Sequence, residues 1–299
     1  MPGALQLPCE ICSSKSLRWA QISGFDHYRC VECRHIFVCP KPSQKELDGF
    51  YARSDYYEHA QQHLVDLERE AEERAERLLR LANRLQLEAR LLDIGCGTGT
   101  FLRAARLCGW SGAGVDRSEE LATQARRNSQ CAVTVGVAEQ VTISGTPFPV
   151  VTAWEVLEHN IDPKAFLKAL ARHTQEGGIV AISTPLADGW IARILGSRFP
   201  MLSPPDHLSI FSKQSLLILA EQSGLEVTRW RAFSNIRSPQ LASGFARFVL
   251  KKRVEDLKWP ASVAVHFLAA AFAWVPKVID FLGQGSEMEV FLRKRAAKA

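Results

Sequence analysis

The chain has 299 residues, of which 46% are hydrophobic and 23% are charged. These fractions are ordinary for a globular protein that buries a proper core, and the length allows one large domain with appendages or two modest domains. The formal net charge is +5 at pH 7, which is mild and mostly scattered, so nothing in the composition requires nucleic acid as a partner.

The eight cysteines bear on the compartment. A disulfide framework is not expected in a chain of this length, and the sequence does not open with the basic, apolar and cleavage pattern of a secretory signal. Four cysteines are paired near the N-terminus and others occur singly, which is typical of a protein kept in a reducing environment. We therefore expect a cytoplasmic protein.

Two cysteine pairs mark the first predicted unit, residues 1–42. Cys9 and Cys12 form one C-x-x-C pair, Cys30 and Cys33 form another, and 17 residues separate the two pairs. Four thiolates close a tetrahedral Zn²⁺ site with no open position, so we expect a structural zinc ribbon. A segment this short buries too little surface to fold alone, and metal would supply the missing stability. A redox pair or metal-free thiols are the alternatives.

Residues 43–90 are predicted to form a helical connector. Ser43 followed by Glu46 indicates a helix start. Between residues 64 and 87, apolar side chains recur at helical spacing among alternating Arg and Glu, which predicts a solvated outer face with i,i+4 ion pairs. The apolar positions are Leu67, Ala71, Ala75, Leu78, Leu81, Ala82 and Leu85.

A glycine-rich turn opens the third unit, residues 91–235. An apolar run leads into Asp93, and Gly95, Gly97 and Gly99 then alternate before a helical pattern begins. Glycine lets the chain turn sharply and lie against a ligand, while the N-terminus of the next helix faces that ligand. Dinucleotide enzymes use a related turn, but the third glycine of their phase is missing here and an acid precedes the first glycine.

Short apolar strands and helical stretches alternate through the rest of this unit. Such alternation predicts an α/β fold with a parallel sheet, helices on both faces, and ligands at the carboxyl ends of the strands. The predicted strands are 91–94, 112–116, 132–136, 149–154 and 178–183, and the predicted helices include 99–108, 118–128 and 163–174.

Asp116 ends the second of these strands, 23 residues after Asp93. That separation is about one βαβ step, and an acid at this point accepts hydrogen bonds from both hydroxyls of a ribose. The alternative is a helix N-cap, for which Ser118 is better placed.

The glycine turn and the segment Glu155-Val-Leu-Glu158-His159 together resemble class I S-adenosylmethionine (SAM) methyltransferases, in the broad branch that includes ubiquinone-biosynthesis O-methyltransferases. The resemblance implies a Rossmann-like sheet and a SAM site, with tyrosines before the connector helix (Tyr51, Tyr56 and Tyr57) as a lid or as an aromatic staple on the core. It assigns SAM contacts to Asp93, Gly95, Cys96, Gly97, Gly99, Asp116, Arg117, Ala138, Glu139 and Trp154.

The same resemblance supplies the candidate catalytic residues Glu155, His159 and His207. In the ubiquinone-pathway relatives the residues matching Glu155, Glu158 and His159 are associated with a divalent metal, which makes Mg²⁺ a candidate cofactor. The alternative is that Glu158 and His159 orient the loop through hydrogen bonds. The segment 204–212 is typical of one branch of the family and places His207 over the substrate pocket, where His207 or His159 would be the base. A packed histidine that locks the loop is the rival interpretation.

The C-terminal part departs from the family pattern. Two antiparallel strands are predicted at 225–233 and 288–293, the latter within a final unit 288–299 that ends in a basic tail, and a helical insert over 236–287 separates them. Within the insert, 18 uncharged residues run from Trp259 to Pro276, at the edge of what spans a bilayer. A span would carry the last strand away from its sheet. With the amphipathic segment 190–201, the insert would form a peripheral patch on anionic lipid at the inner membrane face, or a buried helical cap or dimer face.

The resulting hypothesis is a SAM-dependent methyltransferase that methylates a hydroxyl of a small-molecule, quinone, lipid-linked or sugar acceptor. A sugar C-methyltransferase, and a zinc-ribbon adaptor that retains the fold for binding only, are the alternatives. A dinucleotide oxidoreductase is a weaker one, because of the glycine phase. The sequence leaves the acceptor and the oligomeric state open.

Overall fold

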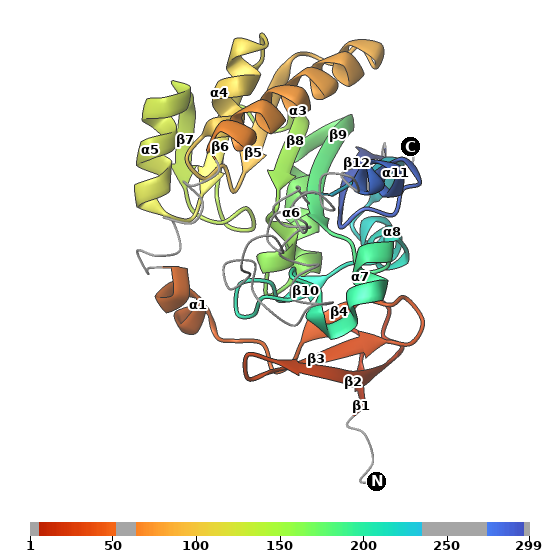
Figure 1. The fold of residues 1–299 in the computed structure, drawn as a ribbon. Coiled ribbons are helices and arrows are strands. Elements are labelled where there is room, and N and C mark those ends of the chain that lie inside the picture. The colour runs from red at the N-terminus through yellow and green to blue at the C-terminus, as the bar shows by residue number, and fades with distance from the viewer. Residues whose placement is uncertain (1–5, 52–63, 235–273, 296–299) are drawn as a thin grey trace, which may run out of the picture.

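The computed structural model describes residues 6–51, 64–234 and 274–295. They form a seven-stranded sheet with helices on both faces and a smaller five-stranded sheet beside one end of it (Figure 1). The strands are β1 (Gln6–Pro8), β2 (Lys15–Ile22), β3 (Phe25–Cys30), β4 (Ile36–Val38), β5 (Arg90–Ile94), β6 (Ser111–Asp116), β7 (Ala132–Val135), β8 (Phe148–Trp154), β9 (Thr174–Pro185), β10 (Ser209–Ile210), β11 (Leu225–Phe233) and β12 (Glu287–Lys294). The helices are α1 (Gln44–Tyr51), α3 (Leu64–Arg84), α4 (Thr100–Leu107), α5 (Glu119–Ser129), α6 (Pro163–His173), α7 (Trp190–Leu195), α8 (Lys213–Gln222) and α11 (Val275–Phe281), with 3₁₀ turns η1 (Leu157–His159) and η2 (Gly196–Arg198).

The large sheet has the strand order β11-β12-β9-β8-β5-β6-β7. Strands β5 to β9 are parallel, and β12 runs antiparallel to both of its neighbours. The order reverses between β5 and β8, and ligands of such sheets bind at the carboxyl ends beside this switch. The predicted α/β class with a Rossmann-like sheet is confirmed.

Adjacent residues of the central strands point to opposite faces and so build two cores. Leu92 and Val151 pack with α6 and α8 on one face, whereas Leu91 and Val150 pack with α3, α4 and α5 on the other. Because both faces are covered, the strands read as continuous apolar runs rather than as alternating ones. The buried strands hold the turns at their carboxyl ends in place, and the site lies at these turns.

Helix α3 presents the predicted apolar stripe to the sheet. Ala71, Ala75, Leu78 and Ala82 are buried, and the predicted i,i+4 pairs form between Arg and Glu one turn apart. Arg74 differs from the solvated outer face predicted for the charged residues of α3, because it is buried against the sheet.

The small sheet has the order β1-β2-β3-β4-β10 (Figure 1). The paired cysteines lie at the turns that join its first four strands. Its fifth strand comes from residues 209–210, where Ser209 pairs with Phe37 and Ile210 with Ile36. The N-terminal ribbon is thus continuous with a loop of the large domain. Sequence analysis did not predict this strand, since two residues are too few to produce a periodic pattern.

Most of the predicted insert, residues 236–273, lies outside the described residues, as do Tyr56 and Tyr57. Within the described part of the chain, no helix has both the length and the apolar character needed to cross a bilayer. The described end of the insert contains the short helix α11, which lies beside β11 and β12 (Figure 1).

Candidate active site

A cavity of about 440 Å³ opens at the carboxyl ends of β5 to β8. Its volume suits a drug-sized ligand. It is lined by Tyr51, Ile94, Gly95, Gly97, Val115, Asp116, Arg117, Ser118, Leu121, Gly136, Val137, Ala138, Glu139, Glu155, Val156, His159, Asn160 and Phe166.

The three glycines of the turn have different surroundings. A Cβ on Gly97 would meet nothing within 4 Å and would point into free space, although φ is +54°. A Cβ on Gly95 would collide with Val156 at 2.6 Å, and one on Gly99 with Ala125 at 2.8 Å. Gly97 therefore keeps backbone open to a ligand, whereas Gly99 allows α4 and α5 to pack closely. Cys96 lies buried under the turn and does not line the cavity.

Asp116 faces the cavity from the end of β6. Its Oδ2 accepts a hydrogen bond from Gly97 N at 2.8 Å and its Oδ1 accepts one from Ser118 N at 2.9 Å. Burial raises the pKa of this carboxyl group, and the two amides oppose that effect. Each oxygen retains a lone pair for a ligand hydroxyl. Ser118 caps α5 through Leu121 N, so the alternative role of helix cap belongs to Ser118, as its position suggested.

The loop after β7 forms the far end of the cavity. Gly136, Val137, Ala138 and Glu139 all line it. The carbonyl oxygens of Ala138 and Glu139 both accept hydrogen bonds from Arg172 Nη2, at 2.9 and 3.0 Å. The loop is therefore held in place by the end of α6, with its apolar Ala138 and its backbone facing the cavity.

Two predicted contact residues lie beneath the cavity rather than in its lining. Asp93 is 2% exposed and accepts a hydrogen bond from Thr152 Oγ1 at 2.6 Å, and burial raises the pKa of its carboxyl group to about 7. Trp154 packs edge-on against Phe101, and the Arg74 guanidinium lies 4.6 Å from its ring centroid. Neither residue is among those that line the cavity, and their contacts support the turn and the strand end. Their contact with SAM stays a prediction.

His159 and Asp206 form an ion pair at the mouth of the cavity. His159 Nδ1 lies 3.0 Å from Asp206 Oδ1, and Tyr51 donates its hydroxyl to the same oxygen at 3.2 Å. Burial lowers the pKa of His159, but the hydrogen bond to Asp206 and the charge of Glu158 outweigh burial and raise it to about 9. At neutral pH His159 thus carries a proton and a positive charge.

His207 packs edge-on against His159 with ring centroids 4.8 Å apart, but it does not line the cavity. Its Nδ1 lies 2.7 Å from Met201 O and so carries the proton. Burial, and then the charge on His159, lower its pKa to about 4. These contacts favour the interpretation of His207 as a packed, neutral histidine that fixes its loop. Its catalytic role stays a prediction.

The carboxylates after β8 differ in environment. Glu155, at φ +52°, lines the cavity and pairs with Arg74 at 3.7 Å. Glu158 is fully buried, and neither of its carboxylate oxygens has a hydrogen-bond partner among the described residues. Burial and the neighbouring Glu155 raise the pKa of Glu158 to about 8. Arg74 also bonds Glu289 of β12 at 3.1 Å, so one buried guanidinium ties α3 to the end of the sheet.

Among the described residues, two groups of side chains have the spacing of metal ligands. The first group consists of the four cysteines Cys9, Cys12, Cys30 and Cys33. The Sγ–Sγ distances are 3.6 Å for Cys9–Cys33, 3.4 Å for Cys12–Cys30 and 3.5 Å for Cys12–Cys33. They are close to the roughly 3.8 Å expected between sulfurs of a tetrahedral ZnS₄ site. The second group is Glu158, His159 and His207. It differs from the expected magnesium set, because His207 takes the place of Glu155, and two nitrogen donors suit transition metals better than Mg²⁺.

Several residues of the site escaped sequence analysis. The sequence predicts that Arg74 lies on a solvated helix face. It indicates a catalytic role for His207 but none for its neighbour Asp206. Glu289 sits in a strand that showed only an apolar pattern. Arg74 and Glu289 are 215 positions apart, so no local pattern indicates that they form a buried pair.

Comparison with known proteins adds family relationships. A family model described as "Methyltransferase domain" matches residues 62–229. A ubiquinone biosynthesis O-methyltransferase of Aeromonas salmonicida is 33% identical over 173 residues, 52% of this chain and 69% of that protein. One of Caulobacter sp. strain K31 is 37% identical over 101 residues, and the match spans only 40% of that relative's length.

Solved structures share the fold. A SAM-dependent methyltransferase from Clostridium acetobutylicum aligns with a TM-score of 0.52 at 12% identity, covering 81% of this chain and 99% of that one. One from Thermotoga maritima aligns with a TM-score of 0.50 at 17% identity, covering 81% and 97%. At these identities the likeness concerns architecture only.

Proposed function

We propose, from the premise that this chain belongs to the methyltransferase domain family, that it binds SAM in the cavity and transfers its methyl group to a hydroxyl oxygen of a small-molecule acceptor. The observation that carries this proposal is the juxtaposition of Gly97, whose missing Cβ leaves backbone open to the cavity, and Asp116, whose carboxylate faces the same space. The dinucleotide alternative is disfavoured by the glycine phase of the turn, which lacks the third glycine of that pattern.

The lining residues fit the parts of SAM. The Gly95–Gly97 backbone would receive the methionine end, Asp116 the ribose hydroxyls, and the loop 136–139 the adenine, with Arg117 beside the ribose. When bound, SAM supplies a methyl group on a sulfonium that is already an excellent leaving group. The residues of the chain therefore have to hold the acceptor in line, exclude water and remove one proton.

His159 is the proposed base, because it lines the cavity while His207 does not. Asp206 fixes the imidazole through Nδ1 at 3.0 Å. Nε2 lies 3.9 Å from Glu158 Oε1, beyond hydrogen-bond distance, so in the neutral form Nε2 can take the acceptor proton beside that carboxyl group. The raised pKa of His159, about 9, matches the acidity of a phenolic hydroxyl, for which the ordinary pKa is about 10. Only a small fraction of His159 is neutral at pH 7, so the activity is expected to rise with pH.

Two observations support a hydroxyl group as the acceptor. Oxygen methylation agrees with the printed name of the relatives and with a base matched to a phenol. Incubation of the protein with methyl-labelled SAM and a lipid extract tests the proposal, with extraction separating apolar from water-soluble products. Label in an alkali-stable ether product supports O-methylation. Label on a sugar carbon would support the C-methyltransferase alternative, and no transfer to any extract would contradict the activity.

We further propose that the four cysteines hold one structural Zn²⁺. The sulfur spacing supports it, as do two amide contacts typical of zinc knuckles, from Ile11 N to Cys9 Sγ and from Cys33 N to Cys30 Sγ, both 3.4 Å. Metal analysis of the protein purified under reducing conditions should give about one zinc per chain. Protein that is folded and metal-free under those conditions would refute the site.

A lipid-linked acceptor is the finer form of the proposal. Trp190 and Ile194 of α7 and Phe281 and Leu282 near α11 are exposed apolar side chains, and the bond from Trp190 N to Gln284 O at 3.1 Å keeps the two helices adjacent. Exposed basic side chains flank them, at Arg193, Arg198 and Lys277. This combination suits the surface of anionic lipid.

Sedimentation with vesicles of anionic and of neutral phospholipid tests this contact. The wild-type protein should pellet with anionic vesicles at low salt, and Phe281→Glu should remain in the supernatant. Equal behaviour of the two proteins would remove this part of the proposal while leaving the methyl transfer untouched.

A further inference from the structure

We infer that Glu10 and Lys41 of the N-terminal ribbon are positioning residues for the acceptor side of the active site, clamping together the two loops that carry His159 and Asp206. This inference rests on the proposed function for the meaning of His159. It gives the ribbon a part in the reaction beyond its own folding.

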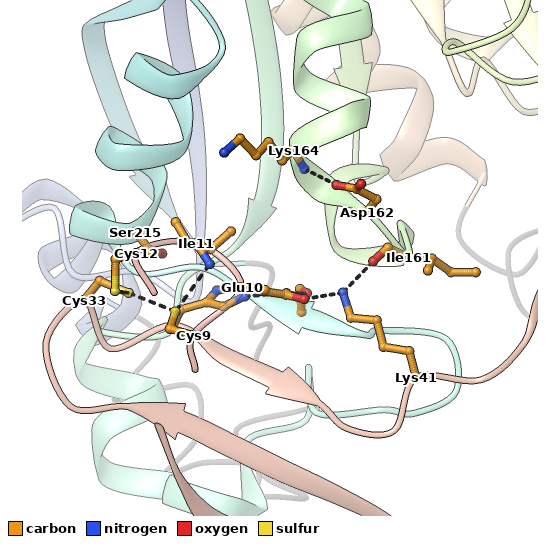
Figure 2. Close-up of polar contacts among 12 residues, drawn as sticks. Cys9, Glu10, Ile11, Cys12, Cys33, Lys41, Ile161, Asp162, Lys164 and Ser215 are labelled. Carbon is orange, nitrogen blue, oxygen red and sulfur yellow. Dashed lines mark hydrogen bonds and ion pairs between the residues drawn. The ribbon is translucent and has the colours of Figure 1, made fainter. Parts of the chain in front are cut away.

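Glu10 reaches out of the first cysteine knuckle to the loop of the large domain (Figure 2). Its Oε1 accepts hydrogen bonds from Ser209 Oγ at 3.0 Å and from His35 Nε2 at 2.8 Å. Ser209 lies three residues after Asp206 and begins β10, the strand that joins the ribbon sheet. One carboxylate oxygen therefore links the second cysteine pair's loop to the segment that bears Asp206.

Lys41 forms the second arm of the clamp (Figure 2). Its Nζ lies 2.6 Å from Glu10 Oε2 and donates to the carbonyl oxygen of Ile161 at 2.6 Å. Ile161 is two residues after His159. The Glu10–Lys41 pair thus touches the chain close to His159 on one side and close to Asp206 on the other.

The side chains of Glu10 and Lys41 are mostly buried, unlike those of an ordinary surface ion pair. The exposed fractions of the two side chains are 15% for Lys41 and 23% for Glu10. Each charged group of the pair also has a partner on the large domain, Ser209 Oγ for Glu10 and the carbonyl oxygen of Ile161 for Lys41, so both arms of the clamp are engaged together.

Backbone contacts carry the clamp's position into the site. Leu208 N donates to Glu158 O at 2.8 Å, and Val38 N donates to Leu208 O at 2.9 Å. The same residue therefore connects β4 of the ribbon to η1, which holds His159. A shift of Ser209 or Ile161 would alter the 3.0 Å approach of Asp206 to His159.

The knuckle that carries Glu10 is itself anchored on the large domain. Gln222 Nε2 of α8 donates to Ile11 O at 2.9 Å, and Ser212 donates its hydroxyl to the carbonyl oxygen of Cys33. These contacts fix the ribbon at the cysteines, so loss of the Glu10–Lys41 pair should free the loops without detaching the ribbon. That difference makes the inference testable.

The experiment compares Glu10→Gln and Lys41→Met in the full-length protein with the control Arg18→Met. Arg18 forms a ribbon ion pair of similar length with Asp26, 2.6 Å, but its side chain is 44% exposed. Hydrogen exchange followed by mass spectrometry reports on peptides covering 157–162 and 204–210. Zinc content, SAM affinity and the kinetics of methyl transfer from labelled SAM to the lipid extract are measured in parallel.

Both clamp variants should keep their zinc and bind SAM within about twofold of wild type. Exchange in the two loop segments should accelerate by about tenfold or more, while the turn at 93–99 stays protected. Turnover should fall by roughly tenfold or more with little change in KM for SAM, because the fault lies in alignment. Lys41→Arg, which keeps the cation and a donor for Ile161 O, should recover much of the loss.

Two results would overturn the inference. One is loop exchange and turnover in both clamp variants equal to those of Arg18→Met. The other is zinc loss with faster exchange through the whole ribbon, which would make the pair merely structural. If no variant and not even the wild type transfers a methyl group, the proposed function fails, but the exchange comparison still decides whether the clamp exists.

Discussion

The ion pair between His159 and Asp206 predicts a distinctive dependence of stability on pH. The pKa of His159 is raised from the ordinary 6.5 to about 9, and both side chains are 21% exposed. A shift of about 2.5 units corresponds to roughly 3 kcal/mol in favour of the charged imidazole, at about 1.4 kcal/mol per unit. Because the folded-state pKa is the higher one, this stabilisation is complete below about pH 6.5 and is lost as the pH rises through about 9.

The substitution Asp206→Asn removes the partner while keeping the shape of the side chain. At about pH 6 it should lower the free energy of unfolding by up to roughly 3 kcal/mol, since it removes the hydrogen-bonded partner of a buried charge and leaves only the more distant Glu158. The assay is urea unfolding at about pH 6 and about pH 9.5, where the gap between variant and wild type should close. Asp26→Asn, which removes an exposed carboxylate that pairs with Arg18, is the control.

The comparison with the variant is needed because other groups titrate in the same window. Burial raises the folded-state pKa of Glu158 to about 8 and that of Asp93 to about 7, so the wild type loses further stability as the pH rises. The contribution of Asp93 is common to both proteins and cancels in the difference. That of Glu158 cancels only in part, because Glu158 Oε1 lies 3.9 Å from His159 Nε2 and each group shifts the pKa of the other. A gap between wild type and Asp206→Asn that stays constant from about pH 6 to about 9.5 would refute the ion pair.

Three further predictions concern single residues of the site. Glu158→Gln should increase the free energy of unfolding above about pH 8, because it removes a buried carboxyl group whose ionisation costs stability as the pH rises from 4.5 through about 8. Urea unfolding in alkaline buffer measures this, and unchanged stability would contradict the raised pKa of this carboxyl group. Gly97→Val should weaken SAM binding by more than about tenfold in calorimetry, since its side chain would project into free space of the cavity; undiminished affinity would place the ligand elsewhere. His159→Gln should abolish the rise of methyl-transfer rate with pH towards about 9, and a pH–rate profile that keeps this limb would remove His159 as the base.

The parts of the fold that could be predicted from sequence are those that local pattern determines. The Asp93–Gly99 turn, the alternation of strands with helices and the stripe Ala71, Ala75, Leu78 and Ala82 all follow from residue spacing along one element. Asp116 could be placed because its distance from Asp93 is one βαβ step. These features set the cavity at the carboxyl ends of the strands.

What escaped prediction depends on contacts between distant segments. The joining of Ser209 to the ribbon sheet, and of Lys41 to Ile161, links residues more than a hundred positions apart. Arg74 read as one charge among many on a solvated helix, and only the packed sheet shows it paired with Glu289. The protonation state of His159 likewise depends on Asp206, which lies 47 positions away in the sequence and meets His159 only in the folded chain.

Isothermal calorimetry with SAM tests the central claim most directly, because it requires no knowledge of the acceptor. SAM should bind at about one site per chain, NADH should not bind, and Asp116→Asn should weaken SAM binding by about tenfold or more through loss of charged hydrogen bonds to the ribose. Binding of neither ligand to the wild-type protein, or binding of NADH alone, would contradict the assignment of this cavity to SAM.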